Sequence, residues 1–128
     1  EVQLTVLEAG PRLGGNHTWS FFETDLTPSQ AELVRPMIAH RWDQYEVRFP
    51  DHQRRLRAGY ASVSAERFDA HLQPMLGDSV RLNAPVAAVG PTSVTLGDQT
   101  TLNADAVIDA RGPTPSPELV LGFQKFVG

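Results

Sequence analysis

The chain has 128 residues, of which 41% are hydrophobic and 20% charged, and it contains no cysteine. This balance is typical of a globular domain and excludes collagen, a coiled coil and a wholly disordered chain. Eleven basic against fifteen acidic residues give a net charge of −4, so the chain as a whole attracts neither nucleic acid nor an anionic membrane. The absence of cysteine excludes disulfide scaffolds, thiolate zinc sites and cysteine nucleophiles.

Apolar patterns lie at both ends of the sequence. Residues 2–7 alternate as a buried strand does, and residues 121–128 stop within an apolar pattern. Because a domain seldom begins with a buried strand, we expect neighbouring segments on both sides. The alternative is a small complete domain with edge strands at its termini.

The first half of the chain predicts a strand, a loop, a helix and a hairpin. Thr27 is suited to cap the helix, with Pro28 in its first turn and Gln30 three residues after the cap. The predicted elements are a buried strand at 2–7, a turn-rich loop at 9–16, a helix from Thr27 that Pro36 ends or kinks, and a strand at 45–49 with its partner at 54–61.

The second half predicts one clear helix followed by short strands. Ser64 caps the helix and Gly77 ends it. Four apolar residues share one helix face: Phe68, Leu72, Met75 and Leu76. Four strands separated by Pro and Gly predict a β-meander: 80–82, 86–89, 93–96 and 100–102. A last buried strand is expected at 104–110, before a stiff Pro-rich loop at 113–117.

Glu8 follows the first predicted strand. Nucleotide-binding α/β folds hold the adenosine ribose with an acidic residue at the carboxyl end of a buried parallel strand. The alternative is a charged residue that leaves a strand into solvent.

Paired glycines follow at a fixed spacing. Gly14 and Gly15 let backbone amides approach a phosphate, and Arg12 beside them can pair with one. The alternative is a plain turn, but the spacing after Glu8 strengthens the nucleotide interpretation.

Two further motifs have both a functional and a purely structural interpretation. Residues 106–112 end a predicted strand in small residues and glycine, which brings backbone close to a ligand or simply forms a turn. The polar and aromatic residues 16–21 are suited to line a pocket or to anchor a loop in the core.

The histidines and the clustered arginines give weaker signals. The four histidines have no metal-ligand spacing, and we expect no metal site: His17, His40, His52 and His71. Arg54, Arg55 and Arg57 form a solvated strand face or a patch that touches lipid headgroups.

Taken together, these motifs resemble the bacterial lycopene β-cyclase family. Residues 7–21 read Leu-Glu-Ala-Gly-Pro-Arg-Leu-Gly-Gly-Asn-His-Thr-Trp-Ser-Phe, and further matches lie at 45–50, 104–113 and 122–128. The order and spacing agree over the whole chain. The Glu-x-x-x-Arg-x-Gly-Gly part is shared by many flavoproteins, whereas Asn-His-Thr-Trp-Ser-Phe is more specific to the cyclases.

The resemblance implies an enzyme that closes the acyclic ends of lycopene, or of a related acyclic carotenoid, into β-ionone rings. The reaction is an isomerisation in which one proton is added, a carbocation closes the ring and another proton leaves. FAD would take part in its reduced form without net redox change, with NAD(P)H as its reductant. His17 and Trp19 would bind the substrate.

The same resemblance implies which residues hold FAD. Glu8 would hold the ribose, and residues 12–15 would lie along the dinucleotide. Residues 86–87 would contact adenine, and residues 110–112 would approach the flavin. The implied cofactor residues are Glu8, Arg12, Gly14, Gly15, Val86, Ala87, Ala110, Arg111 and Gly112.

The expected fold is α/β, or α+β within this segment, with part of a Rossmann-like FAD-binding domain, a β-meander and a partial substrate domain. Residues 1–22 and 64–128 would belong to the FAD-binding domain and 23–63 to the substrate domain. We expect a central fragment that is inactive alone and contains no catalytic residue, since the Gly-x-Gly-x-x-Gly turn and the acidic protonation motif are absent. A His often follows the Trp-Ser-Phe run in this family, but Phe22 stands here.

The resemblance also implies a location. The enzyme would contact the membrane peripherally, in the bacterial cytoplasm or at the inner face of the cytoplasmic membrane, with no nucleic acid partner. Two alternatives stay open: a flavin-dependent oxidoreductase, such as a hydroxylase or polyprenyl reductase, and a non-enzymatic β-rich binding module.

Overall fold

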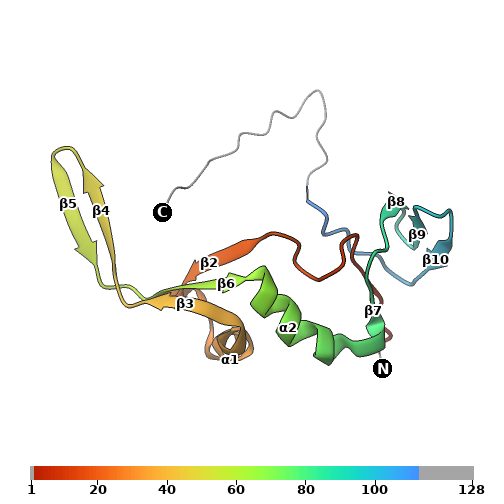
Figure 1. Cartoon of the computed structure of the whole chain (residues 1–128), viewed down its shortest axis with the longest axis horizontal. Coiled ribbons are helices and arrows are strands. Elements are labelled where there is room, and N and C mark those ends of the chain that lie inside the picture. The colour runs from red at the N-terminus through yellow and green to blue at the C-terminus, as the bar shows by residue number, and fades with distance from the viewer. Residues whose placement is uncertain (1, 113–128) are drawn as a thin grey trace. The chain divides into compact units, whose positions relative to one another are not determined.

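The computed structural model describes residues 2–112 and forms two compact units that divide between Val86 and Ala87. Figure 1 labels the elements of both units. The predicted Pro-rich loop at 113–117 and the apolar segment at 121–128 lie outside the described residues. The fold mixes helices with small sheets, as an α+β segment does.

A short parallel strand pair organises one end of the first unit. Strand β1 (Val6–Leu7) pairs in parallel with β7 (Val80–Arg81), and helix α2 (Ala65–Leu76) precedes β7. Parallel strands need such a crossover connection, usually with a helix. The strand predicted at 2–7 is therefore present only at its end, because residues 2–5 have no ladder partner among the described residues and are exposed.

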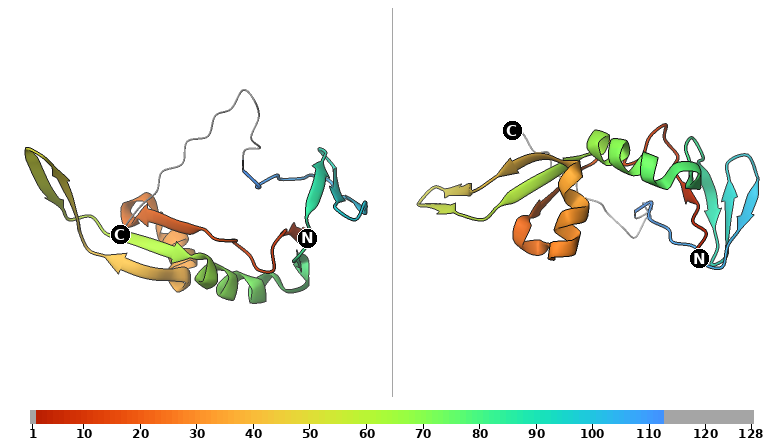
Figure 2. Two further views of the ribbon diagram at one scale, coloured as in Figure 1. Left: turned by 45° about the horizontal axis from the view of Figure 1, so that its top comes forward. Right: turned by 90° about the horizontal axis from the view of Figure 1, so that it is seen from below.

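The core of the first unit lies on a three-stranded antiparallel sheet. Strand β6 (Tyr60–Ser64) lies between β2 (Thr18–Phe22) and β3 (Ile38–Trp42), as Figure 2 shows. Ala61 is fully buried on the central strand, and the neighbouring Ser62 and Val63 are also buried. Neither outer strand was predicted from the sequence.

A separate hairpin projects from this sheet in Figure 1. Strand β4 (Tyr45–Phe49) pairs with β5 (His52–Leu56) around a tight turn. The strand predicted at 45–49 is confirmed, but its partner was wrong in extent. Tyr60 and Ala61 belong to β6 instead, since Gly59 separates the two strands and its carbonyl accepts the Glu23 amide at 2.8 Å.

The helix boundaries follow from capping residues. Helix α1 (Pro28–Val34) begins after Thr27, whose side chain and backbone exchange hydrogen bonds with Gln30. Helix α2 begins after Ser64 and ends at Gly77, which has φ of +50°. Both caps were predicted. Three single turns of 3-10 helix complete the unit: η1 (Glu23–Asp25), η2 (Arg35–Met37) and η3 (Gly77–Ser79).

One residue of the predicted α2 face is wrong. Phe68, Leu72 and Leu76 are half-buried, but Met75 is 63% exposed. Helix α2 packs on β6 and η2. Among residues 2–112, no helix is long and apolar enough to cross a membrane.

The second unit contains the predicted meander. Strands β8 (Val86–Val89), β9 (Ser93–Leu96) and β10 (Thr101–Asn103) form one sheet in the order β10-β9-β8. The strand predicted at 80–82 as the first of the meander is observed as β7, which pairs with β1 instead. The strand predicted at 104–110 is wrong: no described segment pairs with it, and Ile108 is 92% exposed. A strand needs a hydrogen-bonding neighbour, which an apolar pattern alone does not supply.

Candidate functional site

Glu8 lies at the carboxyl end of β1 in a tightly bonded turn. Its backbone forms hydrogen bonds with β7 and with the segment after β7. The Glu8 amide donates to the Arg81 carbonyl at 3.0 Å, and the Glu8 carbonyl accepts the Ala84 amide at 2.9 Å. Its side-chain Oε1 accepts the Gly10 amide at 2.8 Å. The second carboxylate oxygen, Oε2, accepts no hydrogen bond from the described residues. The turn thus fixes the carboxylate and leaves one oxygen for a ligand.

The loop after this turn is anchored to helix α2. Leu13 is buried, and its amide donates to Oδ1 of Asp69 at 2.8 Å. Arg12 lies 3.9 Å from the Glu66 carboxylate, but both side chains are at least half exposed. Such an exposed pair stabilises little. The Arg12 guanidinium therefore stays accessible to an anionic group.

Gly14 and Gly15 both adopt backbone that favours glycine, but their surroundings differ. Their φ angles are +82° and +57°. A Cβ at Gly14 would lie 2.9 Å from Cη2 of Trp19 and 3.2 Å from Cδ1 of Phe68, whereas one at Gly15 would meet nothing within 4 Å. The Gly15 backbone is thus open to a ligand, and Gly14 instead makes room for an aromatic ring.

That ring forms one wall of an apolar hollow in the first unit. The Trp19 and Phe68 ring centroids lie 4.7 Å apart at an angle of 36°. Trp19 and Phe21 share one face of β2, because side chains alternate along a strand. The hollow is open on one side and has a volume of about 200 Å³, and its lining residues are Trp19, Phe21, Val34, Met37, Val63 and Phe68.

His17 lies at the edge of this arrangement. Its ring centroid is 5.8 Å from that of Trp19, and its side chain is exposed. Its carbonyl accepts the Ala65 amide at 3.1 Å, which joins the loop to the start of α2. Of the two predicted substrate residues, Trp19 lines the hollow and His17 does not.

Phe22 has a different neighbourhood. Its ring centroid lies 5.4 Å from Tyr45 and 5.1 Å from Tyr60. This aromatic cluster joins the base of the β4–β5 hairpin to β6. Phe22 therefore has a packing role.

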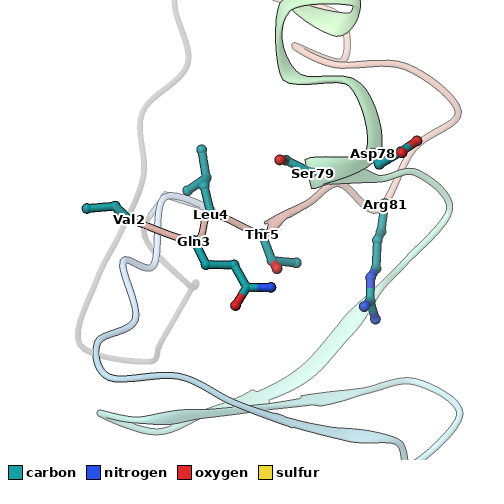
Figure 3. Close-up of a pocket in the computed structure, with 7 residues that line it drawn as sticks. All are labelled: Val2, Gln3, Leu4, Thr5, Asp78, Ser79 and Arg81. Carbon is teal, nitrogen blue, oxygen red and sulfur yellow. The ribbon is translucent and has the colours of Figure 1, made fainter.

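A second hollow, of about 640 Å³, opens at the other end of β1. It is lined by residues 2–5 and by Asp78, Ser79 and Arg81. Figure 3 shows the Arg81 side chain reaching away from Asp78 and Ser79. Ligands of parallel α/β sheets bind at the carboxyl ends of the strands, where Glu8 lies, so this hollow is at the wrong end for a nucleotide.

The remaining predicted cofactor residues lie at Val86 and in the second unit. Val86 and Ala87 begin β8, while Ala110, Arg111 and Gly112 lie in exposed backbone without regular structure. The Arg111 guanidinium donates to both Asp109 oxygens, at 2.9 and 2.7 Å. This contact lowers the pKa of Asp109 to about 2, so the carboxylate stays ionised at neutral pH and competes with any phosphate for Arg111.

Two contributions to this site were not predicted. Asp69 holds the Leu13 amide, and its only sequence signal is a carboxylate one residue after the apolar Phe68. Phe68 itself was assigned to the apolar face of its helix, but not to a pocket. Among residues 2–112, no three His, Asp or Glu side chains gather as metal ligands would.

Comparison with known proteins identifies the family of this chain. The chain matches the lycopene cyclase protein family over residues 1–128. It belongs to the lycopene cyclase family. The predicted resemblance is therefore confirmed, and it covers the whole chain.

Individual relatives agree with this assignment. The chain is 48% identical to a lycopene beta-cyclase of Pseudescherichia vulneris and 40% identical to one of Pantoea ananas, over all 128 residues in each case. It is 41% identical over 121 residues to a lycopene beta-cyclase of Paracoccus sp. (strain N81106 / MBIC 01143). The lycopene cyclase chain spans about a third of the length of these curated relatives, and no solved structure matches it.

Proposed function

We propose that the protein closes the acyclic ends of lycopene into β-ionone rings and that this chain forms part of its flavin and substrate sites. The family match over residues 1–128 carries this proposal. The apolar hollow supports it, because lycopene is a hydrocarbon and offers no polar group to a binding site. The reaction adds one proton and loses another, so the product is an isomer of the substrate.

The residues present fit FAD at the carboxyl end of β1. Glu8 offers a free carboxylate oxygen there, Arg12 is accessible, and the open Gly15 backbone allows close approach. The parallel β1–β7 pair, with helix α2 before β7, supports this proposal because Rossmann-like folds bind dinucleotides at the carboxyl ends of parallel strands joined through helices. When bound in its reduced form, with NAD(P)H as reductant, FAD would supply negative charge that stabilises a nearby carbocation.

The hollow has the size of one ring. An apolar cavity of about 150 Å³ holds benzene, and this hollow encloses about 200 Å³. The Trp19 and Phe68 rings in its walls offer π faces that attract a cation. In this proposal they orient the chain end for ring closure.

The Glu8 carboxylate is expected to contribute strongly to FAD binding. Glu8→Gln keeps an acceptor for the Gly10 amide but removes the charge that would accept ribose hydroxyls. A hydrogen bond to a charged group contributes about 1.5–3 kcal/mol, so the dissociation constant should rise roughly ten- to hundredfold. Flavin fluorescence titration of the full-length protein measures it. The control is Glu32→Gln, an exposed carboxylate on α1, and equal weakening in both variants would contradict the ribose assignment.

The alternative function is a flavin-dependent oxidoreductase on the same scaffold. Product analysis of the full-length protein with lycopene and reduced FAD separates the two. Our proposal predicts a ring-containing isomer without net NAD(P)H consumption, and consumption in proportion to product would favour the oxidoreductase.

The location is also proposed. An enzyme that takes a hydrocarbon from a bilayer needs contact with that bilayer, which favours a peripheral position at the inner face of the bacterial cytoplasmic membrane.

A further inference from the structure

The β4–β5 hairpin carries an unusual share of the chain's positive charge. The hairpin and the residue that follows it, 45–57, contain four arginines and two acidic residues, a net charge of +2, whereas the whole chain carries −4. The hairpin forms its own two-stranded sheet. Its basic character is therefore local and concentrated on a projecting element (Figure 1).

The two faces of the hairpin differ in chemistry. On one face, Glu46 accepts hydrogen bonds from Arg48, Gln53 and Arg55. The opposite face carries Val47 and Phe49, with Arg54 across from Val47 in the register. One acidic charge is thus neutralised within the hairpin.

The distal end of the hairpin exposes an aromatic side chain. Phe49 ends β4 and is 64% exposed. Arg54 and Arg57 are exposed and have no acidic partner among residues 2–112. We call Phe49, Arg54 and Arg57 the hairpin patch. Phe49 has one unpaired arginine, Arg54, on its own face of the hairpin, and Arg57 follows at the base of the hairpin after β5. Exposed aromatic and guanidinium groups on one projecting element match the boundary between acyl chains and anionic headgroups.

We propose that the hairpin patch docks the protein on an anionic lipid surface, with Phe49 entering the headgroup region and the arginines pairing with lipid phosphates. Charge complementarity selects this occupant. Because the chain as a whole is acidic, its approach to an anionic surface is most favourable when the basic hairpin faces that surface. Arginine side chains reach such phosphates while their stems cover apolar surface. The inference deepens the membrane contact proposed above by naming its surface.

Vesicle binding tests the inference without measuring cyclase activity. The hairpin inference can therefore fail while the proposed reaction holds, and the proposed reaction can fail while the hairpin inference holds. The full-length protein is sedimented at low and high ionic strength with vesicles of phosphatidylcholine alone and of phosphatidylcholine mixed with phosphatidylglycerol. We expect preferential binding to the anionic vesicles that weakens with salt.

Two changes to the patch should weaken this binding. The double variant Arg54→Glu/Arg57→Glu should bind at least about twentyfold more weakly, since each arginine near an anionic surface contributes roughly a fivefold factor. Phe49→Ser should weaken binding about tenfold through lost apolar burial. The matched control is Arg35→Glu/Arg67→Glu, which changes the net charge equally at exposed positions outside the hairpin.

Several results would overturn the inference. The inference is wrong if the protein does not bind anionic vesicles. It is also wrong if the control pair weakens binding as much as the patch variants do, or if both patch variants bind as the unaltered protein does. A lowered thermal unfolding midpoint in Phe49→Ser would show that protein covers the ring, and this would also contradict a lipid-facing role.

Discussion

Gly14→Ala should destabilise the full-length protein by about 2–5 kcal/mol, whereas Gly15→Ala should cost about 1–2 kcal/mol. Both glycines have positive φ, where a Cβ costs about 1–2 kcal/mol. Only at Gly14 would the Cβ also collide, at 2.9 Å from Trp19 and 3.2 Å from Phe68. Overpacking of this kind adds about 1–3 kcal/mol.

Denaturant unfolding of the two alanine variants measures this difference. The Cβ of Gly14→Ala would displace the Trp19 ring, so the Trp19 fluorescence should change in Gly14→Ala and not in Gly15→Ala. Equal destabilisation of the two variants would show that the loop adjusts freely and that Gly14 does not support the ring.

Trp19→Ala should lower kcat/KM for ring closure by about thirtyfold or more. Trp19 forms a wall of the hollow against Phe68, and loss of a desolvated cation–π contact alone costs about 2 kcal/mol. Trp19→Phe keeps a π face and should retain intermediate activity. Product formation from lycopene by the full-length variants measures both.

Trp42→Ala is the matched control for this prediction. Trp42 is another exposed tryptophan, on β3, and does not line the hollow. It should leave kcat/KM within about twofold of the unaltered protein, since changes outside a site rarely affect it strongly. Similar losses in the Trp19 and Trp42 variants would point to general destabilisation and contradict a substrate role for the hollow.

Local chemistry predicted the helices and the glycine-containing turn after β1 well. Thr27 and Ser64 cap the helices because their hydroxyls accept amides of the first turn. The need for glycine at Gly14 and Gly15 was also readable, since paired glycines often mark positive φ. These features depend on neighbours in sequence.

Features that depend on distant partners were missed. Strand β2 has no period-2 pattern because its aromatic residues contact different elements. Trp19 contacts Phe68 on α2, whereas Phe22 contacts Tyr45 on β4 and Tyr60 on β6. The apolar run at 104–110 was predicted as a strand, but no described segment pairs with it. The hollow combines residues from β2, α1, η2, β6 and α2, so the motif at 16–21 could indicate only the β2 part of its lining.

Mass analysis of the product made in D2O tests the central claim most directly. Our account predicts an isomer of lycopene that carries one deuteron for each ring closed, because a solvent proton adds to the terminal double bond and a different proton leaves. No net NAD(P)H should be consumed. A product that gained hydrogen or oxygen atoms, with NAD(P)H consumed in proportion, would contradict the cyclase account.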